Sequence, residues 1–469
     1  MLPREYFDDP LTCGTAYGAL QHVVNNRFTL LKLPTGYGKT TISMRVASTL
    51  ANVQNGSLQL MIIAPKAKRL DNSFTEAVES TEKYFDVSLN VLPINEQQVG
   101  TFAGVNAMKK KEQMWNGFVQ RLKEQPTLLI LDETHMQLRN ATGLANKTFK
   151  KLFKEVEKAG SQLKILGLTA TPFDKSIIDS VGYLVLNGNY TSRTNFYRRE
   201  VKGYGNSYSR GINQRDIENM IVDDSFKIHK EMFNDINRVI SSLKMMFYMP
   251  LAPRNFHIPE NRFEEVNVEL SSEGQKRLKR VELMEKEKAY PDNGSKITDY
   301  TKVLTTDPEV LNQVLRLVQN SKINQPLIFY SLNNTRDAVI KLFKNYGINY
   351  LEVNGHSQSY FKKNDEHSPV LVQFRSGAAA FESKASNTSI YLDLPASSID
   401  YQQSLGRNAR RGQEIEYVTN YIIHPLKTNG RTIKYFEKKH NQIVNKTKWN
   451  EKFEKTFETP WGQFEEDTL

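Results

Sequence analysis

A glycine-containing loop between an apolar strand and a helix is the feature that most constrains the fold of this chain. The loop spans residues 33–40 and reads Leu-Pro-Thr-Gly-Tyr-Gly-Lys-Thr. It follows the apolar run 28–33, which predicts a short buried strand, and it precedes residues 41–47, which predict the start of a helix. Such an arrangement surrounds a phosphate group with backbone N–H groups and a helix N-terminus. The sequence therefore predicts a nucleoside triphosphate site within an α/β fold.

Four residues of this loop have a chemical reason to be there. Gly36 and Gly38 allow the tight backbone curl, Lys39 can reach the terminal phosphates, and the Thr40 hydroxyl can ligate Mg²⁺. Leu33 stands where this pattern usually has its first glycine. An ordinary strand–turn–helix remains the alternative for this stretch taken alone. The predicted nucleotide-binding residues are Thr35, Gly36, Tyr37, Gly38, Lys39 and Thr40.

Two acidic residues follow a second apolar run, residues 128–131, which predicts a parallel strand covered on both faces. Asp132 is expected to hold Mg²⁺, commonly through water, because this ion takes few direct carboxylates. Glu133 is expected to orient or deprotonate the attacking water. His135 is either part of the same machinery or a structural histidine. An acidic loop after a strand is a common alternative for the pair alone, and the glycine loop makes it improbable.

Two further patterns lie downstream. The apolar strand 165–168 ends in Thr-Ala-Thr-Pro at 169–172, and residues 403–413 read Gln-Ser-Leu-Gly-Arg-Asn-Ala-Arg-Arg-Gly-Gln. Arg407 and Arg410 are three residues apart, so a helix would place them on one face. Arginines directed at a triphosphate stabilise the charge of the transferring phosphoryl group. In isolation, the second pattern would instead be read as a solvated basic helix.

In this order, the four patterns resemble the motif set of superfamily 2 helicases and translocases of the DExH type, from about residue 33 to 413. Residues 251–271 and 375–393 are similar to segments of the Swi/Snf-type translocases and related phage helicases, although Ala379 replaces an expected glycine. The resemblance implies two RecA-like lobes that bind ATP and Mg²⁺ between them, with nucleic acid crossing both lobes.

The resemblance also implies roles for individual residues. Lys39, Asp132, Glu133, Arg407 and Arg410 become the catalytic set, with the two arginines acting as arginine fingers from the second lobe. Neither arginine is expected to be needed for folding, because exposed charges contribute little to stability. The residues expected to couple hydrolysis to nucleic acid are His135, Thr169, Thr171 and Gln403.

Two basic segments are candidates for contacts with the nucleic-acid backbone. The turn after strand 58–64 contains Lys66, Lys68 and Arg69, and the family uses the equivalent loop for such contacts. A solvated basic turn is the alternative. Residues 193–210, which include Arg198 and Arg199, mix basic and aromatic side chains. This mixture suits phosphate contacts with base stacking, and it equally suits a partly exposed loop.

Charge and composition agree with a polyanionic partner. The 469 residues carry a formal net charge of +11, and the pI is about 9.3. A single cysteine, Cys13, excludes an internal disulfide and a cysteine-built metal site. No apolar run approaches the length of a membrane span, and the N-terminus lacks the order of a secretory signal. We therefore expect a cytoplasmic protein, in a bacterial host if the Lys- and Asn-rich chain is of phage origin. We also expect it to be a monomer.

The pattern of strands and helices predicts two domains. Alternating strands and helices over 58–64, 128–131 and 164–168, and again over 326–331, 350–355, 370–374 and 389–393, indicate α/β architecture with two tandem RecA-like parallel-sheet lobes. We expect lobe 1 at 1–187, a mostly helical or irregular intervening segment at 188–322 and lobe 2 at 323–425. Residues 426–469 are expected to be a helical extension packed on lobe 2.

The sequence thus predicts an ATP-dependent nucleic-acid helicase or translocase acting on DNA. Three alternatives stay open: a duplex-DNA translocase that remodels branched junctions or bound proteins, an RNA helicase, and a catalytically silent nucleic-acid-binding module. The intact catalytic set argues against the silent module. Nothing in the sequence separates DNA from RNA, because both present the same backbone phosphates.

Overall fold

The structure is a computed structural model, and it describes residues 2–34, 36–64, 73–92, 109–138, 142–173, 177–204, 217, 221, 228–250, 257–320, 322–355, 359–362, 365, 367–374, 383, 385–395, 397–410, 413 and 415–459. The chain divides into two compact units. The first contains Met1–Asn255 together with Lys448–Leu469, and the second contains Phe256–Thr447. Each unit has its own buried hydrophobic core.

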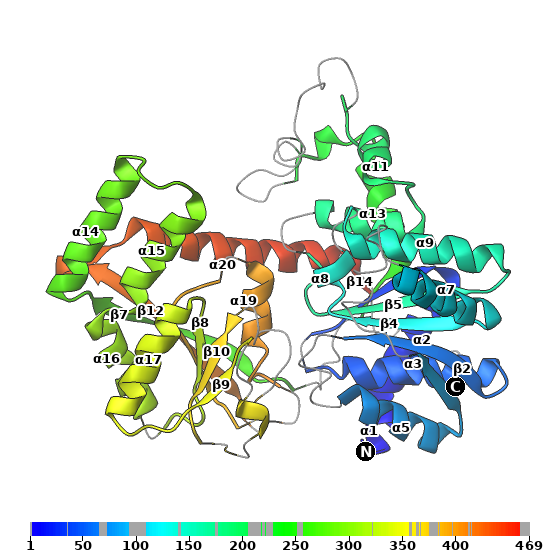
Figure 1. The fold of residues 1–469 in the computed structure, drawn as a ribbon, viewed down its shortest axis with the longest axis horizontal. Coiled ribbons are helices and arrows are strands. Elements are labelled where there is room, and N and C mark those ends of the chain that lie inside the picture. Colours follow the sequence, from blue (N-terminus) through cyan, green and yellow to red (C-terminus); the bar gives the residue numbers. More distant parts are fainter. Residues whose placement is uncertain are drawn as a thin grey trace. The chain divides into compact units, whose positions relative to one another are not determined.

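A parallel sheet forms the centre of the first unit. Among the described residues its strand order is β14-β6-β1-β5-β4-β2-β3, and each neighbouring pair is parallel. All six residues of β4 are buried, as expected for a strand covered by helices on both faces (Figure 1). The strands are β1 (Phe28–Lys32), β2 (Ser57–Ile63), β3 (Ser88–Leu92), β4 (Thr127–Asp132), β5 (Leu163–Thr169), β6 (Phe247–Pro250) and β14 (Glu458–Thr459).

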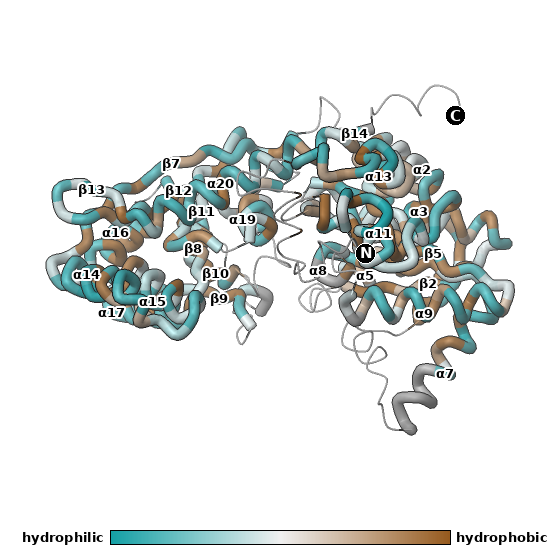
Figure 2. The backbone as a smooth tube through the Cα atoms, turned by 90° about the horizontal axis from the view of Figure 1, so that it is seen from above, coloured by the Kyte–Doolittle hydropathy of each residue, from teal (hydrophilic) through white to brown (hydrophobic). Residues whose placement is uncertain are grey.

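The helices of the first unit bury apolar residues and expose polar ones, so their colour changes repeatedly along the backbone in Figure 2. The helix α2 begins with Pro10, and the Asp9 carboxylate accepts a hydrogen bond from the Thr12 backbone N–H. The helices are α1 (Glu5–Asp8), α2 (Pro10–Asn25), α3 (Lys39–Val53), α5 (Ser73–Phe85), α7 (Lys109–Glu124), α8 (His135–Leu138), α9 (Leu144–Lys158), η1 (Ile177–Ser180), α10 (Val181–Asn187), α11 (Arg193–Glu200), η3 (Lys230–Met232), α13 (Ile236–Met246) and η6 (Lys455–Phe457).

The second unit is built on another sheet, with the described strand order β13-β12-β11-β8-β10-β9 and with β7 paired to β12. Its pairs are parallel except for the short antiparallel pair of β12 and β13. The long β7 pairs along its whole length with β12. The strands are β7 (Glu260–Glu269), β8 (Leu327–Tyr330), β9 (Leu351–Val353), β10 (Val370–Gln373), β11 (Thr388–Tyr391), β12 (Tyr417–Lys427) and β13 (Arg431–Thr432).

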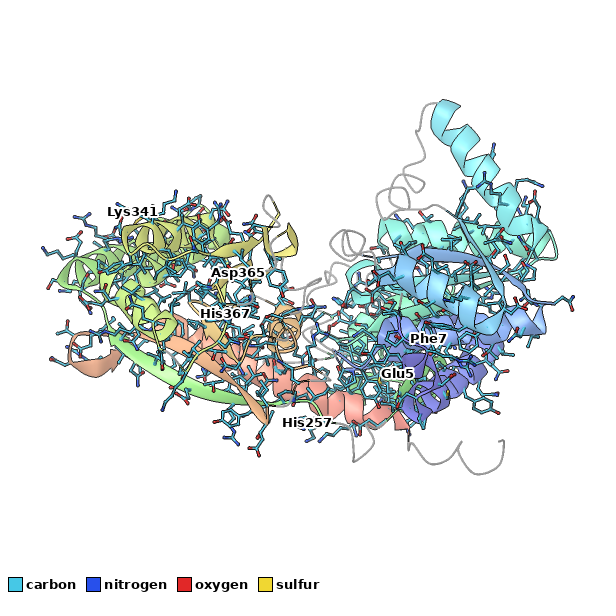
Figure 3. All side chains as sticks on the ribbon, turned by 90° about the horizontal axis from the view of Figure 1, so that it is seen from below. Glu5, Phe7, His257, Lys341, Asp365 and His367 are labelled. Carbon is cyan, nitrogen blue, oxygen red and sulfur yellow. The ribbon has the colours of Figure 1, made fainter. Side chains whose placement is uncertain are left out.

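Helices and side-chain caps surround this second sheet. The buried Asp307 accepts hydrogen bonds from the Ser271 hydroxyl and the Glu309 backbone N–H, and it thereby joins two helix starts. In the loop before β10, Asp365 accepts the backbone N–H of His367, and both are labelled in Figure 3. The helices are α14 (Ser272–Lys286), α15 (Asn293–Thr305), α16 (Pro308–Val318), α17 (Asn333–Asn345), η4 (Ser359–Lys362), α19 (Ser398–Leu405), η5 (Thr428–Gly430) and α20 (Lys434–Glu454).

The two parallel-sheet lobes predicted from the sequence are confirmed, but the units divide the chain elsewhere than at the predicted boundaries. The segment 188–322 is not a separate body, because β6 belongs to the first sheet and β7 to the second. The prediction that the extension 426–469 packs on lobe 2 is wrong from Lys448 onward, because these residues belong to the first unit. Short strands such as β6 and β14 carry too few residues to show a period.

Among the helices that the structure describes, none combines the length and the apolar character needed to cross a bilayer.

Candidate nucleotide and nucleic-acid sites

The glycine loop leaves the sheet at the end of β1. The Leu33 backbone N–H donates to the Thr169 carbonyl at 3.0 Å, so the loop starts beside the end of β5. Gly36 and Gly38 both have a φ of 85°, a left-handed conformation that side chains other than glycine rarely adopt. Apart from its two chain neighbours, no described residue would come within 4 Å of a Cβ added at Gly38, so there is open space beside the loop. The backbone therefore has the curl and the room that a phosphate needs.

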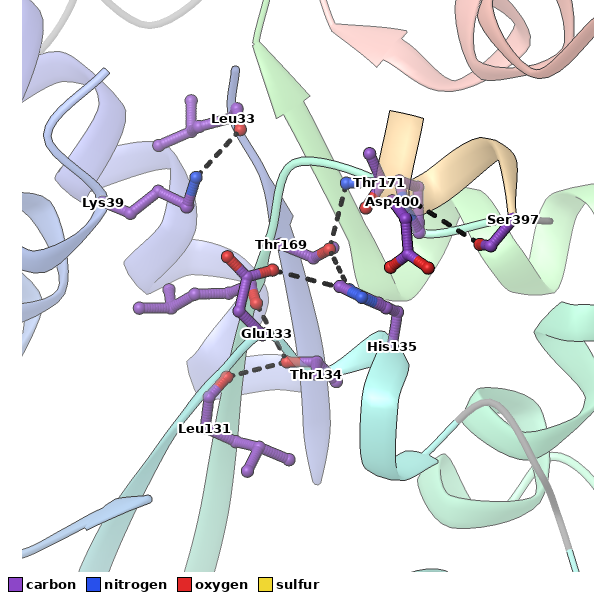
Figure 4. A network of polar contacts seen from close by, with 12 residues as sticks. Leu33, Lys39, Leu131, Glu133, Thr134, His135, Thr169, Thr171, Ser397 and Asp400 are labelled. Carbon is purple, nitrogen blue, oxygen red and sulfur yellow. Dashed lines mark hydrogen bonds and ion pairs between the residues drawn. The ribbon is translucent and has the colours of Figure 1, made fainter. Parts of the chain in front are cut away.

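Lys39 begins α3 directly after this curl. Its side chain is buried, and its Nζ lies 3.5 Å from the Leu33 carbonyl oxygen, across the mouth of the loop (Figure 4). Tyr37 is also buried, whereas Thr40 is half-buried at the start of the helix. Thr35 lies outside the described residues. A left-handed glycine pair, a lysine across the loop and a helix N-terminus are the features that fit a triphosphate.

The acidic turn after β4 is strained and tightly held. Asp132 is the last residue of β4 and is 1% exposed, and Glu133 has a φ of 49°, which is unusual for a residue with a side chain. Thr134 holds the turn, because its hydroxyl donates to the Leu131 carbonyl at 2.7 Å and its N–H donates to the Leu168 carbonyl at 3.0 Å. Strain of this kind persists only where its surroundings enforce it.

Gly167 explains how Thr134 approaches β5 so closely. A Cβ at Gly167 would lie 2.6 Å from the Thr134 hydroxyl oxygen, closer than real Cβ contacts allow. Neither Thr134 nor Gly167 was identified from the sequence. The signal was present in a glycine interrupting an otherwise apolar strand, which often marks a close approach of another chain segment.

A buried hydrogen-bond network joins the acidic turn to the third motif (Figure 4). The His135 Nδ1 lies 3.0 Å from the Thr169 hydroxyl oxygen and 3.5 Å from Glu133 Oε2. The Thr171 backbone N–H donates to the same Thr169 oxygen at 3.0 Å. The structure therefore brings together residues of two separate sequence motifs, Glu133 and His135 of the acidic turn and Thr169 and Thr171 of the third motif. Because these contacts form one buried network, a displacement of any of the four side chains would change the contacts of the others.

In the second unit, the segment that contains the two arginines is not helical. The helix α19 ends at Leu405, with Gly406 as its C-cap, so the prediction that Arg407 and Arg410 share a helix face is wrong. The Arg407 backbone N–H donates to the Ser404 carbonyl at 3.1 Å, which forms a turn. Gln403, the coupling candidate, is buried within α19. Glycine stops the helix before the pattern of arginines begins.

Both arginines are buried, with exposed fractions of 3% for Arg407 and 7% for Arg410. The reading of this stretch as a solvated basic helix is therefore wrong, and so is the basis for expecting that neither arginine affects stability. Removing a buried charge leaves its partners unsatisfied. The side chain of Asn408 fastens the turn to the sheet by donating to the Ser386 and Ser389 hydroxyl oxygens, each at 3.1 Å.

The candidates for nucleic-acid contact fall in two places. Lys66, Lys68 and Arg69 lie outside the described residues. Arg198 and Arg199 are exposed on α11, whereas the neighbouring Phe196 and Tyr197 are buried in the core of the first unit. The base-stacking role considered for this segment is thus closed to these two aromatic rings, and phosphate contact remains open to the arginines.

The helix α11 is fixed by a buried carboxylate, Glu200. Glu200 accepts a hydrogen bond from Arg238 Nη2 at 2.7 Å and one from the Tyr190 hydroxyl at 2.9 Å. Burial and the adjacent Glu200 carboxylate raise the pKa of the Tyr190 hydroxyl well above its usual range. The Glu200 carboxylate is buried and paired within the unit, so the exposed charges of α11 are those of its arginines.

Part of the chain matches the sequence model of a known protein family. Residues 15–174 match the family model for the type III restriction enzyme, res subunit, which is a superfamily 2 helicase-like domain. The matched segment contains the glycine loop, the acidic turn and the Thr169–Thr171 motif. The predicted resemblance to superfamily 2 helicases and translocases is therefore confirmed for the segment 15–174.

The structure is also similar to a particular solved protein, described as the ATP-dependent Type ISP restriction-modification enzyme LlaBIII bound to DNA. The TM-score is 0.51 and the sequence identity is 13%, over 94% of this chain and 29% of that one. At this identity the likeness shows the fold alone, and this chain spans less than a third of that enzyme. A comparison with curated protein sequences gave no match.

Proposed function

We propose that this protein is a nucleic-acid-dependent ATPase that uses hydrolysis to move along DNA as a helicase or translocase. The observation that carries the proposal is the contact between the acidic turn and the third motif. His135 joins Glu133 to Thr169 beside a glycine loop with two left-handed glycines. A merely structural fold would have no use for a strained carboxylate and a desolvated histidine at that place.

The residues of the first unit divide the work on the nucleotide. The N–H groups of 36–40 bind phosphate oxygens, and the Lys39 ammonium neutralises their charge. Thr40 and Asp132 would hold Mg²⁺, which supplies further neutralisation of the phosphate charge when bound. Glu133 orients the attacking water and accepts its proton, while His135 fixes the orientation of that carboxylate.

The second unit is proposed to supply Arg407 and Arg410 to the same nucleotide. An arginine has a permanent charge and a planar fork of donors, which suits it to the equatorial oxygens of the transferring phosphoryl group. Its removal is expected to affect hydrolysis far more than nucleotide affinity. Gln403, Thr169 and Thr171 are proposed to transmit the state of the nucleotide to the nucleic-acid track.

DNA is the proposed polymer, and its backbone is the proposed contact of Lys66, Lys68, Arg69, Arg198 and Arg199. The support is the net charge of +11, the exposure of the α11 arginines, and a structural neighbour whose printed description has it bound to DNA. Phosphate contacts supply affinity without sequence preference. We propose that the protein works as a monomer in the cytoplasm.

The test is the rate of ATP hydrolysis with single-stranded DNA, duplex DNA, forked DNA and RNA, with Mg²⁺ present. Stimulation by DNA above that by RNA supports the proposal, and stimulation by RNA alone replaces DNA with RNA as its polymer. Absence of stimulation by any polymer, in a protein that binds ATP, rejects the motor function.

A second candidate is duplex translocation without strand separation, which the restriction-enzyme family match favours. Two assays separate it from a helicase: displacement of a third strand from a triplex, and displacement of one strand from a fork. Triplex displacement without fork unwinding supports the translocase, and fork unwinding supports the helicase.

A further inference from the structure

The last described residues of the chain complete the core of the first unit. The strand β14 pairs in parallel with β6, and the ring of Phe453 lies 5.1 Å from that of Phe173, between centroids. Phe457 packs against Phe247 with ring centroids 5.7 Å apart. The segment from Lys448 onward is therefore part of the fold that carries the glycine loop and the acidic turn.

Two polar residues on this segment are buried, and they lie one helical turn apart at the end of α20. Asn450 is 0% exposed and Glu454 is 5% exposed. The Asn450 Nδ2 donates to the Phe173 carbonyl at 3.0 Å, and the Glu454 Oε2 lies 3.0 Å from the Lys32 Nζ. Burying an amide and a carboxylate is costly unless each has a specific partner. Apolar side chains would hold the helix on the sheet with a smaller desolvation penalty. The presence of Asn450 and Glu454 at these buried positions therefore needs another explanation.

The partners of Asn450 and Glu454 lie just after β5 and at the end of β1, beside the third motif and the glycine loop. Lys32 is the last residue of β1, is paired in register with Thr169, and directly precedes the glycine loop. Phe173 comes two residues after Thr171, in the segment that leaves β5. Glu454 therefore contacts the strand end from which the glycine loop starts, and Asn450 contacts the residue that directly follows the third motif.

The same helix makes a comparable contact in the second unit, where α20 begins. Lys439 Nζ lies 3.9 Å from Asp393 Oδ2, just after the end of β11. Burial raises the pKa of the Asp393 carboxyl, and the Lys439 ammonium opposes that shift. In each unit, α20 thus brings one charged side chain to the carboxyl end of a central strand.

We propose that Glu454 and Asn450 are positioning residues for the nucleotide site of the first unit. Glu454 fixes the end of β1 through Lys32, and Asn450 fixes the exit of the third motif through the Phe173 carbonyl. The inference rests on the proposed function, since it names further residues that the same site depends on. The competing explanation is that both residues only hold the end of α20 in place.

The test measures binding of a fluorescent ATP analogue with Mg²⁺, at least 10 °C below the melting temperature of each full-length variant. We expect Glu454→Gln and Lys32→Met to weaken the analogue by at least ~5-fold, because small displacements at a preorganised site are costly. The exchange K32E/E454K should recover part of that loss. Asn450→Ala should weaken binding by a smaller factor, since it removes neutral hydrogen bonding and no ion pair.

The matched control is Glu200→Gln, which neutralises another buried, ion-paired carboxylate of the first unit. It should keep the wild-type affinity for the analogue even where its melting temperature falls. Wild-type affinity in Glu454→Gln and Asn450→Ala overturns the proposal, and so does an equal loss in the control. If Glu454→Gln does not fold, Asn450→Ala and the exchange variant decide the question.

The outcome is independent of the motor test. A wild-type protein that binds the analogue but shows no stimulation by nucleic acid loses its proposed function. The ratios of affinity among the variants would still show whether Glu454 and Asn450 position the site.

Discussion

The two units share an architecture but hold their candidate site residues in different ways. In the first unit, the segments that follow β4 and β5 are linked to each other by short contacts among Glu133, His135, Thr169 and Thr171. In the second unit, Arg407 and Arg410 lie on a turn after α19, fastened to the sheet by Asn408. The first arrangement is a hydrogen-bonded network within one body, and the second is a pair of buried arginines on a turn that the Asn408 amide fastens to two serine hydroxyls.

The units also differ in how the chain completes them. The second unit is continuous from Phe256 to Thr447, whereas the first needs residues from Lys448 onward. A change near the C-terminus is therefore predicted to disturb the unit with the glycine loop. The comparison teaches that sequence distance from a motif is a poor guide to structural dependence.

The largest predicted effect tests whether nucleotide chemistry belongs to the first unit. Lys39→Ala should abolish hydrolysis while the fold and nucleic-acid binding persist, because the side chain neutralises phosphate charge. The control is Lys341→Ala, an exposed lysine on α17, the helix that follows β8 in the second unit (Figure 3). ATPase assays and thermal melting of both variants check this. Near wild-type hydrolysis by Lys39→Ala would remove the central claim.

The next prediction concerns the second unit. Arg410→Ala should lose nucleic-acid-stimulated hydrolysis by about 10³–10⁵-fold while ATP binding persists, as for an arginine that acts on the transferring phosphoryl group. Because Arg410 is buried, we also expect a lower melting temperature. Arg410→Lys serves as the matched variant, since it keeps the charge and loses the fork of donors. Arg407→Ala should behave similarly, with a greater loss of ATP affinity.

Full stimulation in both alanine variants would contradict the comparison, because the second unit would then contribute nothing to hydrolysis. Loss of stability with retained stimulation would assign the arginines a structural role.

A smaller effect is predicted at the strained acidic turn. Glu133→Gln should bind ATP and slow its hydrolysis by roughly 10²–10⁴-fold, because the group that positions and deprotonates water is lost while Asp132 remains. The measurement is single-turnover hydrolysis beside nucleotide affinity. The control is Glu155→Gln on α9, which removes an acid paired with Lys158 on the outside of the unit. If Glu133→Gln no longer bound ATP, the division of labour between the two acids would be wrong.

The fourth prediction measures phosphate contact by the α11 arginines. Replacing Arg198 and Arg199 together by alanine should lower the magnitude of the log affinity–log salt slope by about 1.8 on duplex DNA, at roughly 0.9 for each contact. The double variant Lys276→Ala and Lys279→Ala on the exposed face of α14 is the control and should keep the slope. An unchanged slope in the α11 variant would leave its arginines as solvated surface charges.

Much of the site could be predicted because chemistry and local pattern coincide there. Apolar runs predict β1, β4 and β5, and small or acidic residues at their ends mark the loops that carry Lys39 and Glu133. Two kinds of feature escaped. The turn that contains Arg407 was assigned to a helix, because a spacing of three residues suits a helix and Gly406 stops it earlier. Asn450 escaped because its contact with Phe173 is made between segments far apart in the sequence.

The smallest predicted effect is a dependence of stability on pH that arises from Glu454. Burial raises the pKa of this carboxyl above its ordinary 4.5, and the Lys32 ammonium opposes the shift without cancelling it. The folded protein therefore binds this proton more tightly than the unfolded chain does. The resulting stabilisation is complete below the ordinary pKa and is lost as pH rises through the raised value.

The variant Glu454→Gln cannot titrate at this position. As pH rises above about 4.5, the unfolding free energy of the wild type should therefore fall relative to that of the variant. Urea denaturation of both proteins at several pH values measures that difference, and Glu200→Gln repeats the comparison at a buried carboxylate away from the glycine loop. A difference that stays constant with pH would mean that Glu454 keeps an ordinary pKa, and that its pairing with Lys32 fully offsets the cost of its burial.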